Sequence, residues 1–462
     1  MNAPATDARG SRPYDTVVIG GGLSGLVGAW HLRDRDVLVL EGEERVGGRI
    51  KSATRGEHWL NLGAHLVSDG HVIHDLAKEF HVSLVIPPGL TGTAVIWRSR
   101  LVRTRHPEYL PLRLALSLPD RIALCRMGLR LRTAHPRAIQ ADSCGLLGPH
   151  VDPPVMGVDA SLERRSFADL VSGSGSGVYE LLRIAANRAA AEPDEVSAHY
   201  LSMSSLGAGA APRYNVVGGT EQLILELQRA LGQRVRTGCR VDRVTPLDDR
   251  VRVEFVGPEG PGTVDARTCL VTTPAPVARA IVRGLPPAKD TALGSIAYGA
   301  YVVVGFFTSE RRPLPWADRY MVIAPGRAFG LLFNAANASR AGTGSQTGGG
   351  FIVYAGGLRA RTLMSWPDEA IAGLFLDDLV RLAPDLAGAV DETVVQRWPL
   401  GNAITGVGRA ALQPDIVAPV GRVHFAGDYI GHPGMDSAAS VAIHAAREIR
   451  RHLDTDGIRF AA

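Results

Sequence analysis

The order of apolar and polar residues predicts a strand followed by a helix near the N-terminus. Residues 16–19 read Thr-Val-Val-Ile, which is typical of a strand buried on both faces of a parallel sheet. Apolar side chains then recur at the spacing of an amphipathic helix, at Leu23, Leu26, Val27 and Trp30. A second apolar run at residues 36–41, DVLVLE, predicts the next strand and ends in Glu41.

The rest of the chain continues this mixture of strands and helices. Short strands are predicted for CRVDRV, VRVEF, TCLVTTP, AYVVVGFF, GGFIVYAGG and VHFA, whereas residues 91–206 have a mostly helical pattern. The last helix is predicted to begin near Met435, with small residues for close packing at Ala438, Ala442, Ala445 and Ala446. The pattern favours an α/β fold.

The loop between the first strand and helix has the form G-x-G-x-x-G, made by Gly20, Gly22 and Gly25. In a dinucleotide site the first glycine permits the tight turn, the second lets a pyrophosphate approach the backbone, and the third lets helix and strand pack closely. The N–H groups at the start of the helix favour phosphate charge. We therefore expect the whole loop, including Gly21 and Ser24, to contact a dinucleotide.

A glycine-rich turn without any ligand is the alternative explanation of this loop. The second strand argues against it, because Glu41 ends that strand 21 residues after Gly20. An acidic residue at this place can accept hydrogen bonds from ribose hydroxyls. NAD and FAD share this fingerprint, so the loop alone leaves both cofactors open.

Charge and cysteine content indicate which kinds of ligand and site the protein is expected to have. The formal net charge is +4, and only Lys51, Lys78 and Lys289 are lysine, so the basic residues are almost all arginine. Arginine favours contacts with carboxylates and other anions, which keeps an acidic ligand open beside the simpler explanation of dispersed surface charge. The sequence contains no block of like charges that would indicate nucleic-acid binding. The four cysteines form no CxxC pair, so neither a disulfide framework nor a metal site is expected.

The chain is predicted to be a cytoplasmic protein. Its first residues, MNAPATDARGSRP, lack the apolar segment of a secretion signal. The longest nearly apolar run, residues 295–307, is shorter than the roughly 20 residues that span a bilayer.

The stretch after Glu41, GEERVGGRI, completes the pattern E-x5-G-G-R with Gly47, Gly48 and Arg49. At this point the sequence resembles the flavin-containing amine oxidase superfamily, which includes protoporphyrinogen oxidases, phytoene-type desaturases and amine oxidases. The resemblance implies FAD as the cofactor instead of NAD, with Gly48 and Arg49 running beside it.

Further blocks carry the same resemblance in the expected order. LNLGAHLV is similar to the family segment that passes the flavin, and it implies that Gly63, Ala64 and His65 lie near the ring, although Asn61 replaces the usual acidic residue. The remaining cofactor contacts implied by the family pattern are Val241 at the adenine, Gly427 and Asp428 at the ribityl or pyrophosphate region, and Met435 at the helix facing the flavin.

The positions of these blocks predict the domain organisation. Residues 1–90, 207–286 and 399–462 would form an FAD-binding, Rossmann-like domain of the glutathione-reductase type. Residues 91–206 and 287–398 would form an interleaved α+β substrate domain. The first of these inserts contains YLPLRLALSLPDRIALCRMGLRLR, whose leucines and arginines suit either helices covering a substrate cavity, which we favour, or peripheral contact with an anionic membrane. The sequence does not indicate the oligomeric state.

A flavoenzyme of this kind moves a hydride from a small-molecule substrate to flavin N5. Amine oxidases of the family carry a lysine on the strand that matches residues 296–307 and a tyrosine that matches Gly434; this chain has neither. These departures favour an oxidase or desaturase that acts on a C–H bond of a hydrophobic or heterocyclic metabolite. The alternatives are an amine or amino-acid oxidase that makes an imine and hydrogen peroxide from oxygen, and an FAD-binding isomerase or non-catalytic flavoprotein.

Two histidines are candidates for catalysis. His65 could act as a base near the ring, and His432 lies in the loop before the last helix. A histidine that only hydrogen-bonds to backbone or packs in a loop explains each position as well. Trp398, Tyr298 and Tyr301 are candidates for the cavity wall, and core packing accounts for them equally.

Overall fold

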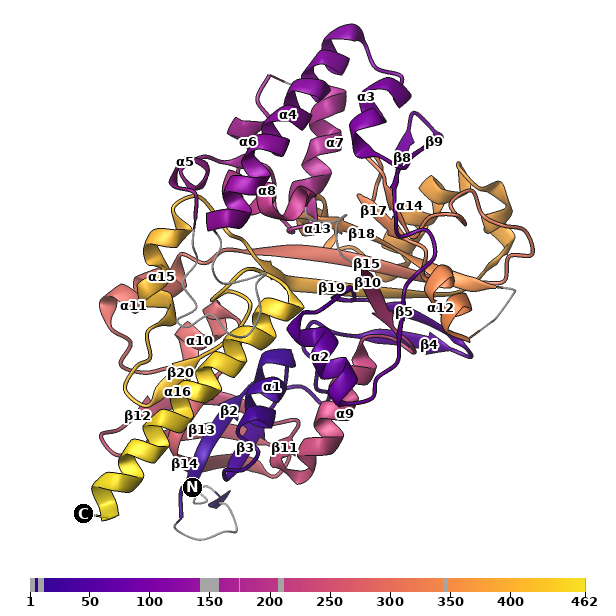
Figure 1. The fold of residues 1–462 in the computed structure, drawn as a ribbon. Coiled ribbons are helices and arrows are strands. Elements are labelled where there is room, and N and C mark those ends of the chain that lie inside the picture. Colours follow the sequence, from indigo (N-terminus) through magenta and orange to yellow (C-terminus); the bar gives the residue numbers. More distant parts are fainter. Residues whose placement is uncertain are drawn as a thin grey trace.

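The computed structural model describes residues 5–6, 12–141, 158–173, 175–206, 212–343 and 348–461. Its elements form two large sheets with helices around them (Figure 1). The predicted α/β fold is therefore confirmed. Among the described residues, no helix is both long and apolar enough to cross a bilayer.

The first sheet has eight strands and surrounds the predicted strand at the N-terminus. Its path is β11-β3-β2-β14-β13-β12, and β1 and β20 also pair with β14. The central strand β2 (Tyr14–Ile19) is parallel to both of its neighbours, β14 and β3. Its apolar residues are buried, as is usual for a parallel strand with both faces of its sheet covered. The other strands are β1 (Ala5–Thr6), β3 (Val37–Leu40), β11 (Val235–Arg236), β12 (Arg240–Pro246), β13 (Val251–Gly257), β14 (Gly260–Val271) and β20 (Val423–Phe425).

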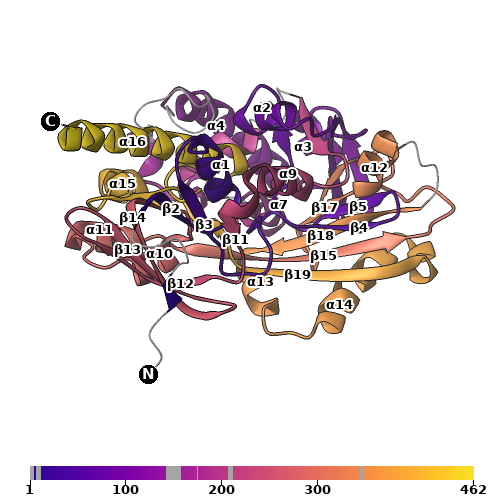
Figure 2. The ribbon, with the colours of Figure 1, turned by 90° about the horizontal axis from the view of Figure 1, so that it is seen from below.

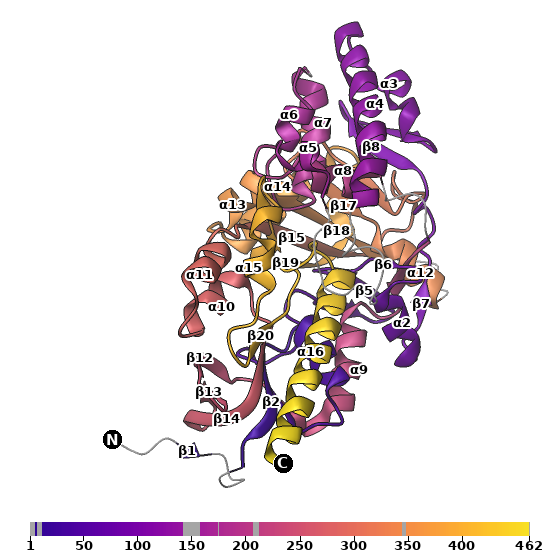
Figure 3. The same ribbon diagram turned by 60° about the vertical axis from the view of Figure 1, so that its left-hand side comes forward.

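Helices from distant parts of the chain cover this sheet. The first helix α1 (Leu23–His31) contacts both α9 (Glu221–Leu231) and the long C-terminal helix α16 (Met435–Ala461). Figure 3 shows α16 running along the sheet, where it packs on α1, β14 and β20. The predicted start of the last helix near Met435 is confirmed. Further helices near this sheet are α2 (Val72–Glu79), α10 (Ala275–Ile281), α11 (Pro287–Gly294) and α15 (Gln413–Val417).

The second sheet has seven strands in the order β19-β15-β18-β17-β16-β8-β9. Its two longest strands, β15 (Tyr298–Thr308) and β19 (Val390–Ala403), pair antiparallel and run across the molecule (Figure 2). The predicted domain boundary at residues 398–399 falls inside β19, and the domain boundaries stay a prediction. The other strands are β8 (Thr93–Trp97), β9 (Arg100–Thr104), β16 (Met321–Ile323), β17 (Leu331–Phe333) and β18 (Gly349–Gly356).

The insert at residues 91–206 is only partly helical, since β8 and β9 belong to the second sheet. Its helices form a separate group at the end of the molecule opposite both termini (Figures 1 and 3). They are α3 (Leu110–Arg113), α4 (Leu118–Ala141), α5 (Ala160–Glu163), α6 (Phe167–Leu170), α7 (Ser176–Asn187) and α8 (Ala198–Leu206). The remaining helices and small strands are α12 (Ala335–Thr343), α13 (Gly357–Leu363), α14 (Asp368–Val380), β4 (Ser52–Arg55), β5 (His58–Asn61), β6 (Val67–Ser68), β7 (Leu84–Val85) and β10 (Arg213–Val216).

Candidate active site

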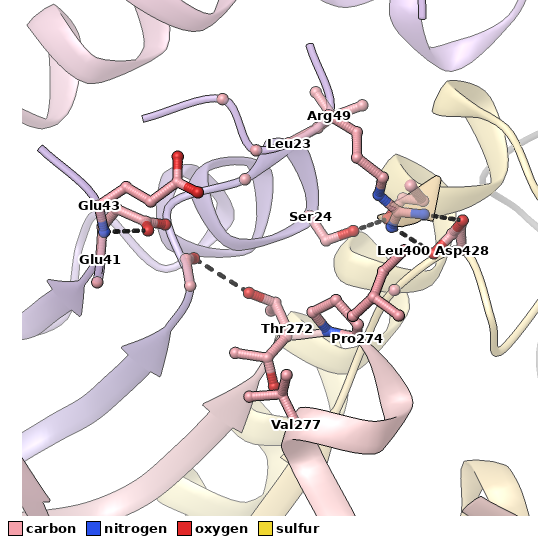
Figure 4. A pocket seen from close by; sticks show the side chains of 18 of the residues that line it. Leu23, Ser24, Glu41, Glu43, Arg49, Thr272, Pro274, Val277, Leu400 and Asp428 are labelled. Carbon is pink, nitrogen blue, oxygen red and sulfur yellow. Dashed lines mark hydrogen bonds and ion pairs between the residues drawn. The ribbon is translucent and has the colours of Figure 1, made fainter. Parts of the chain in front are cut away.

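A cavity of about 450 Å³ opens where β2, β3 and β14 end. The carboxyl ends of parallel strands are the usual place for ligands in sheets of this kind. Most of the predicted cofactor residues line this cavity, and Figure 4 shows several of them around it. They are Gly20, Gly22, Ser24, Glu41, Gly48, Arg49, Ala64, Val241, Gly427, Asp428 and Met435.

The glycine loop has the geometry that a dinucleotide requires. Gly20 has φ +104°, which side chains rarely tolerate, and a β-carbon at Gly25 would lie 1.8 Å from the Gly20 carbonyl oxygen. These two glycines therefore serve the turn and the close packing of α1 on β2. A β-carbon at Gly22 would meet no atom within 4 Å and would project into open space. Gly22 thus leaves room for a ligand beside the backbone.

The N-terminus of α1 adds an electrostatic reason for an anion in this place. Gly22 is the N-cap, no side chain caps the helix, and its first turn contains no acidic residue. The first N–H groups of a helix have no partner within the helix, and the helix dipole favours negative charge there. Leu23 and Ser24 of this first turn line the cavity. A pyrophosphate fits this end of the cavity.

Glu41 is held against the glycine loop at the end of β3. Its Oε2 accepts a hydrogen bond from the backbone N–H of Gly21 at 2.5 Å, and its Oε1 accepts one from Glu43 at 2.8 Å. Burial raises the pKa of this carboxyl, and the backbone N–H groups of Glu43 and Gly21 oppose that rise. Gly21 therefore lies behind the carboxylate and does not itself line the cavity.

Arg49 and Asp428 form a bidentate ion pair across the cavity wall. Nη1 of Arg49 lies 2.8 Å from Oδ2 of Asp428, and Nη2 lies 2.7 Å from Oδ1 (Figure 4). Burial alone would lower the pKa of Arg49, but the nearby Asp428 carboxylate outweighs it and the net shift is upward. The pair joins the loop after β3 to the loop after β20. The sequence assigned both residues to the cofactor site and did not predict that they bind each other.

The second sheet closes the other side of the cavity through the end of β19. Trp398, Leu400 and Asn402 line it, and the indole N–H of Trp398 donates to the Leu62 carbonyl at 2.7 Å. Thr272, directly after β14, also lines it and donates to the carbonyls of Ile19 and Gly20. Thr272 and Asn402 were not among the residues predicted from the sequence. The position of Thr272 after a strand parallel to β2 was a usable signal, because such strands end at the same edge.

His65 lies behind the cavity wall. Its Nδ1 donates to the carbonyl of Gly63 at 3.1 Å, and its ring meets Phe333 edge-on at 4.7 Å between centroids. Among the described residues, its enclosed Nε2 has no hydrogen-bond partner. Burial lowers the pKa of His65 to about 4, so the imidazole is neutral and a weak base near pH 7.

His432 is also outside the cavity lining. It is buried in the loop before α16, and its ring stacks on Tyr200 of α8 with centroids 5.8 Å apart. Gly25 and Gly63 likewise stand behind the lining residues, and a β-carbon at Gly63 would lie 2.1 Å from the Arg49 carbonyl oxygen. The structure therefore places both candidate catalytic histidines beside the cavity, in packing positions.

Two buried histidines predict a loss of stability in acid. Burial lowers the pKa of His65 and of His424 from 6.5 to about 4, so the unfolded chain binds more protons between these values. Their contribution is complete above pH 6.5 and is lost as the pH falls to about 4. Between pH 7 and pH 5 we expect each to cost about 2 kcal/mol of unfolding free energy.

Denaturant unfolding of wild type and His424→Gln at the two pH values measures this effect. The variant cannot be protonated, so its loss on acidification should be smaller than that of wild type by about 2 kcal/mol. Equal losses in the two proteins would show that His424 does not titrate as its burial requires.

Comparisons with known proteins agree with this geometry. The family model for flavin containing amine oxidoreductases matches residues 23–450. An L-amino-acid oxidase of Protobothrops flavoviridis is 24% identical over 96% of this chain and 90% of its own length. A flavin-dependent L-tryptophan oxidase of Lentzea aerocolonigenes is 24% identical over 94% of this chain and 97% of its own.

Solved structures show the same fold. Putrescine oxidase bound to putrescine has a TM-score of 0.77 at 18% identity, with 95% of this chain and 99% of that chain covered. Cyclohexylamine oxidase from Brevibacterium oxydans has a TM-score of 0.77 at 20% identity, with 96% and 100% covered. With a family model that spans nearly the whole sequence and a cavity that fits FAD, the chain belongs to the flavin containing amine oxidoreductases and is an FAD-dependent oxidoreductase.

Proposed function

We propose that the protein oxidises the C–N bond of an amino acid to an imine, with oxygen as the electron acceptor and hydrogen peroxide as the second product. FAD supplies the hydride acceptor, its N5 atom. The amino-acid and amine oxidases among the relatives support this reading above the carbon-skeleton dehydrogenation that the missing lysine and tyrosine favoured. The observation that carries the choice of an amino acid is the surroundings of Arg188.

The chain's own residues would divide the work of holding FAD along the cavity. The N-terminus of α1 and Gly22 would hold the pyrophosphate, Glu41 would accept ribose hydroxyls, and Val241 would contact the adenine. The N-terminus of α16 at Met435 would favour negative charge on the ring system. Each of these groups lines the cavity.

The backbone at Arg188 lies beside the end of β19 that lines the cavity. It follows α7, and its carbonyl oxygen accepts a hydrogen bond from the hydroxyl of Tyr301. The next carbonyl, of Ala189, accepts from the side chain of the cavity-lining Asn402 at 3.1 Å. These contacts fix the end of α7 against the cavity.

The Arg188 side chain provides a cation that no carboxylate of the described residues pairs with. Burial raises the pKa of Tyr354 to about 12, against the opposing effect of the Arg188 charge and its hydrogen bond to the phenol. In the described part of the chain, Arg188 has no ion-pair partner. A half-buried guanidinium beside aromatic rings is suited to a substrate carboxylate. Tyr301 and Tyr354, whose ring centroids are 5.6 Å apart, would exclude water from an apolar substrate side chain.

Matched substrates test this function. Peroxide release should be measured for aromatic and aliphatic L-amino acids and for the amines that their decarboxylation gives. We expect amino acids to be preferred, and we expect Arg188→Met to lower kcat/KM for amino acids by roughly 10- to 100-fold while leaving amines almost unchanged.

Arg361→Met is the matched control, because Arg361 lies at the surface and forms an ion pair with Glu195. This variant should have the wild-type kcat/KM for both amino acids and amines. Equal turnover of amines and amino acids with no effect of Arg188→Met would contradict the carboxylate assignment. Turnover of cyclic C–H substrates alone would contradict C–N oxidation altogether.

His65→Ala should lower turnover less than fivefold and keep FAD bound. A neutral imidazole with a pKa of about 4 behind the wall contributes packing instead of proton transfer. Steady-state turnover at saturating substrate, with the flavin content of each preparation, checks this. A loss of about 100-fold with full flavin, the usual size of an acid–base contribution, would instead assign His65 as the base.

A further inference from the structure

Helix α4 has two apolar faces, and only one of them is buried against other helices. Leu124, Met127, Leu131 and Ala134 are buried at spacings of three, four and three residues, and they pack in the helical core with α7 and α8. Leu118, Ile122, Cys125 and Leu129 form a second line at spacings of four, three and four residues. Successive helix residues turn by about 100°, so this second line lies on the opposite face of α4.

The second face is open to solvent. Leu118 is 70% exposed, Ile122 50% and Leu129 65%, and Cys125 is exposed as well. Two more large apolar side chains on the preceding short helices, Tyr109 and Leu112, are 50% and 69% exposed. We call Leu118, Ile122, Cys125 and Leu129 the outer stripe. Isolated exposed leucines are ordinary, but several aligned on one helix indicate a binding surface.

Arginines border the outer stripe on both sides. Arg121 and Arg132 fall on one side of it by helical spacing, and Arg126 falls on the other. Arg126 and Arg132 are exposed. In the first part of α4 Asp120 is the sole acidic residue, and it bonds Ser117. The surface therefore combines apolar side chains with positive charge.

We infer that the outer stripe of α4 lies on the surface of an anionic lipid bilayer. A helix with an apolar face bordered by arginines lies in the plane of a membrane, with its apolar side chains at the acyl boundary and its cations at the lipid phosphates. A second copy of the chain fits less well, because symmetric pairing of two stripes would bring their arginines together. Figures 1 and 3 show α4 at the end of the molecule away from both termini, where a flat surface can reach it.

The leucines and arginines of this segment were expected to belong to helices that cover a substrate cavity. In the structure Leu124, Met127 and Leu131 pack in a hydrophobic core, and the described lining of the FAD cavity includes no residue of α4. The side chains of the outer stripe are exposed and do not line the FAD cavity, so the inference is independent of the proposed reaction.

Vesicle flotation of the FAD-loaded protein tests the inference. Wild type should float with vesicles of phosphatidylcholine and phosphatidylglycerol in equal parts and should stay behind with phosphatidylcholine alone. Leu118→Gln, Ile122→Gln and Leu129→Gln combined should weaken binding on the order of 100-fold or more, and Arg126→Gln with Arg132→Gln about 30-fold. Leu225→Gln, at an exposed leucine of α9, is the control and should bind as wild type does.

The inference is overturned if wild type does not float with anionic vesicles, or if the triple variant and the Leu225 control float equally. It is also overturned if sedimentation shows a dimer that the triple variant converts to a monomer, because a second copy would then cover the outer stripe. Flavin content and turnover of all variants should match wild type, which shows that they are folded.

Discussion

Gly22→Val is expected to give a folded protein whose affinity for FAD is lower by about 100-fold or more. An added β-carbon meets no protein atom within 4 Å, and the backbone there has φ −73° and ψ 179°, which any residue adopts. The space that it fills is the cavity beside the N-terminus of α1, where the pyrophosphate fits. The apoprotein should therefore stay folded, at a small cost because valine caps a helix less well than glycine, and cofactor binding should be lost.

Equilibrium titration of apoprotein with FAD, followed by flavin fluorescence, measures this change, and thermal unfolding of the same apoprotein checks the fold. Gly373→Val in α14 is the matched control, because its β-carbon also meets nothing within 4 Å and it lies outside the cavity. The control should bind FAD as wild type does. Normal FAD affinity in Gly22→Val would show that the cofactor does not pass the loop.

Asp428→Ala should destabilise the apoprotein by about 3 kcal/mol. The carboxylate is buried, whereas the Arg49 guanidinium opens onto the cavity, so the cost falls at the lower end of that for a broken buried pair. The pair also ties the loop after β3 to the loop after β20, and its loss should weaken FAD binding too. Denaturant unfolding without FAD separates the effect on folding from the effect on binding.

The surface pair of Arg35 and Asp454 provides the control for this prediction. Its closest atoms are 2.6 Å apart, yet Asp454 is 58% exposed, so Asp454→Ala should cost less than about 1 kcal/mol. If Asp428→Ala were as mild as Asp454→Ala, the ion pair would not hold the two loops together. Adding Arg49→Met to Asp428→Ala should recover part of the loss, because no unpaired charge then remains.

The parts of the site that lie close in sequence could be predicted. The run from Thr16 through the glycine loop to Glu41 forms strand, turn, helix and strand from local patterns, and the structure places its ends together because parallel strands share an edge. The start of α16 and its small-residue face were predictable for the same reason. Family resemblance added the residues near Arg49 and Val241.

Contacts between distant residues could not be predicted from local pattern. Arg49 and Asp428 are 379 residues apart, and each has several possible partners in an unfolded chain. The strands β8 and β9 are short and lie in a segment with a helical pattern, so only the pairing of β8 with β16 and with β9 identifies them. The sequence could not single out Arg188, because only the fold shows that it has no ion-pair partner among the described residues.

Anaerobic mixing of the FAD-loaded protein with single substrates tests the central claim most directly. The flavin colour should bleach in one turnover with an L-amino acid, more slowly with the corresponding amine, and the product should be the imine or the keto acid that forms from it in water. A flavin that stays oxidised with every amino acid and amine, and bleaches with a cyclic C–H substrate, would contradict the proposed reaction.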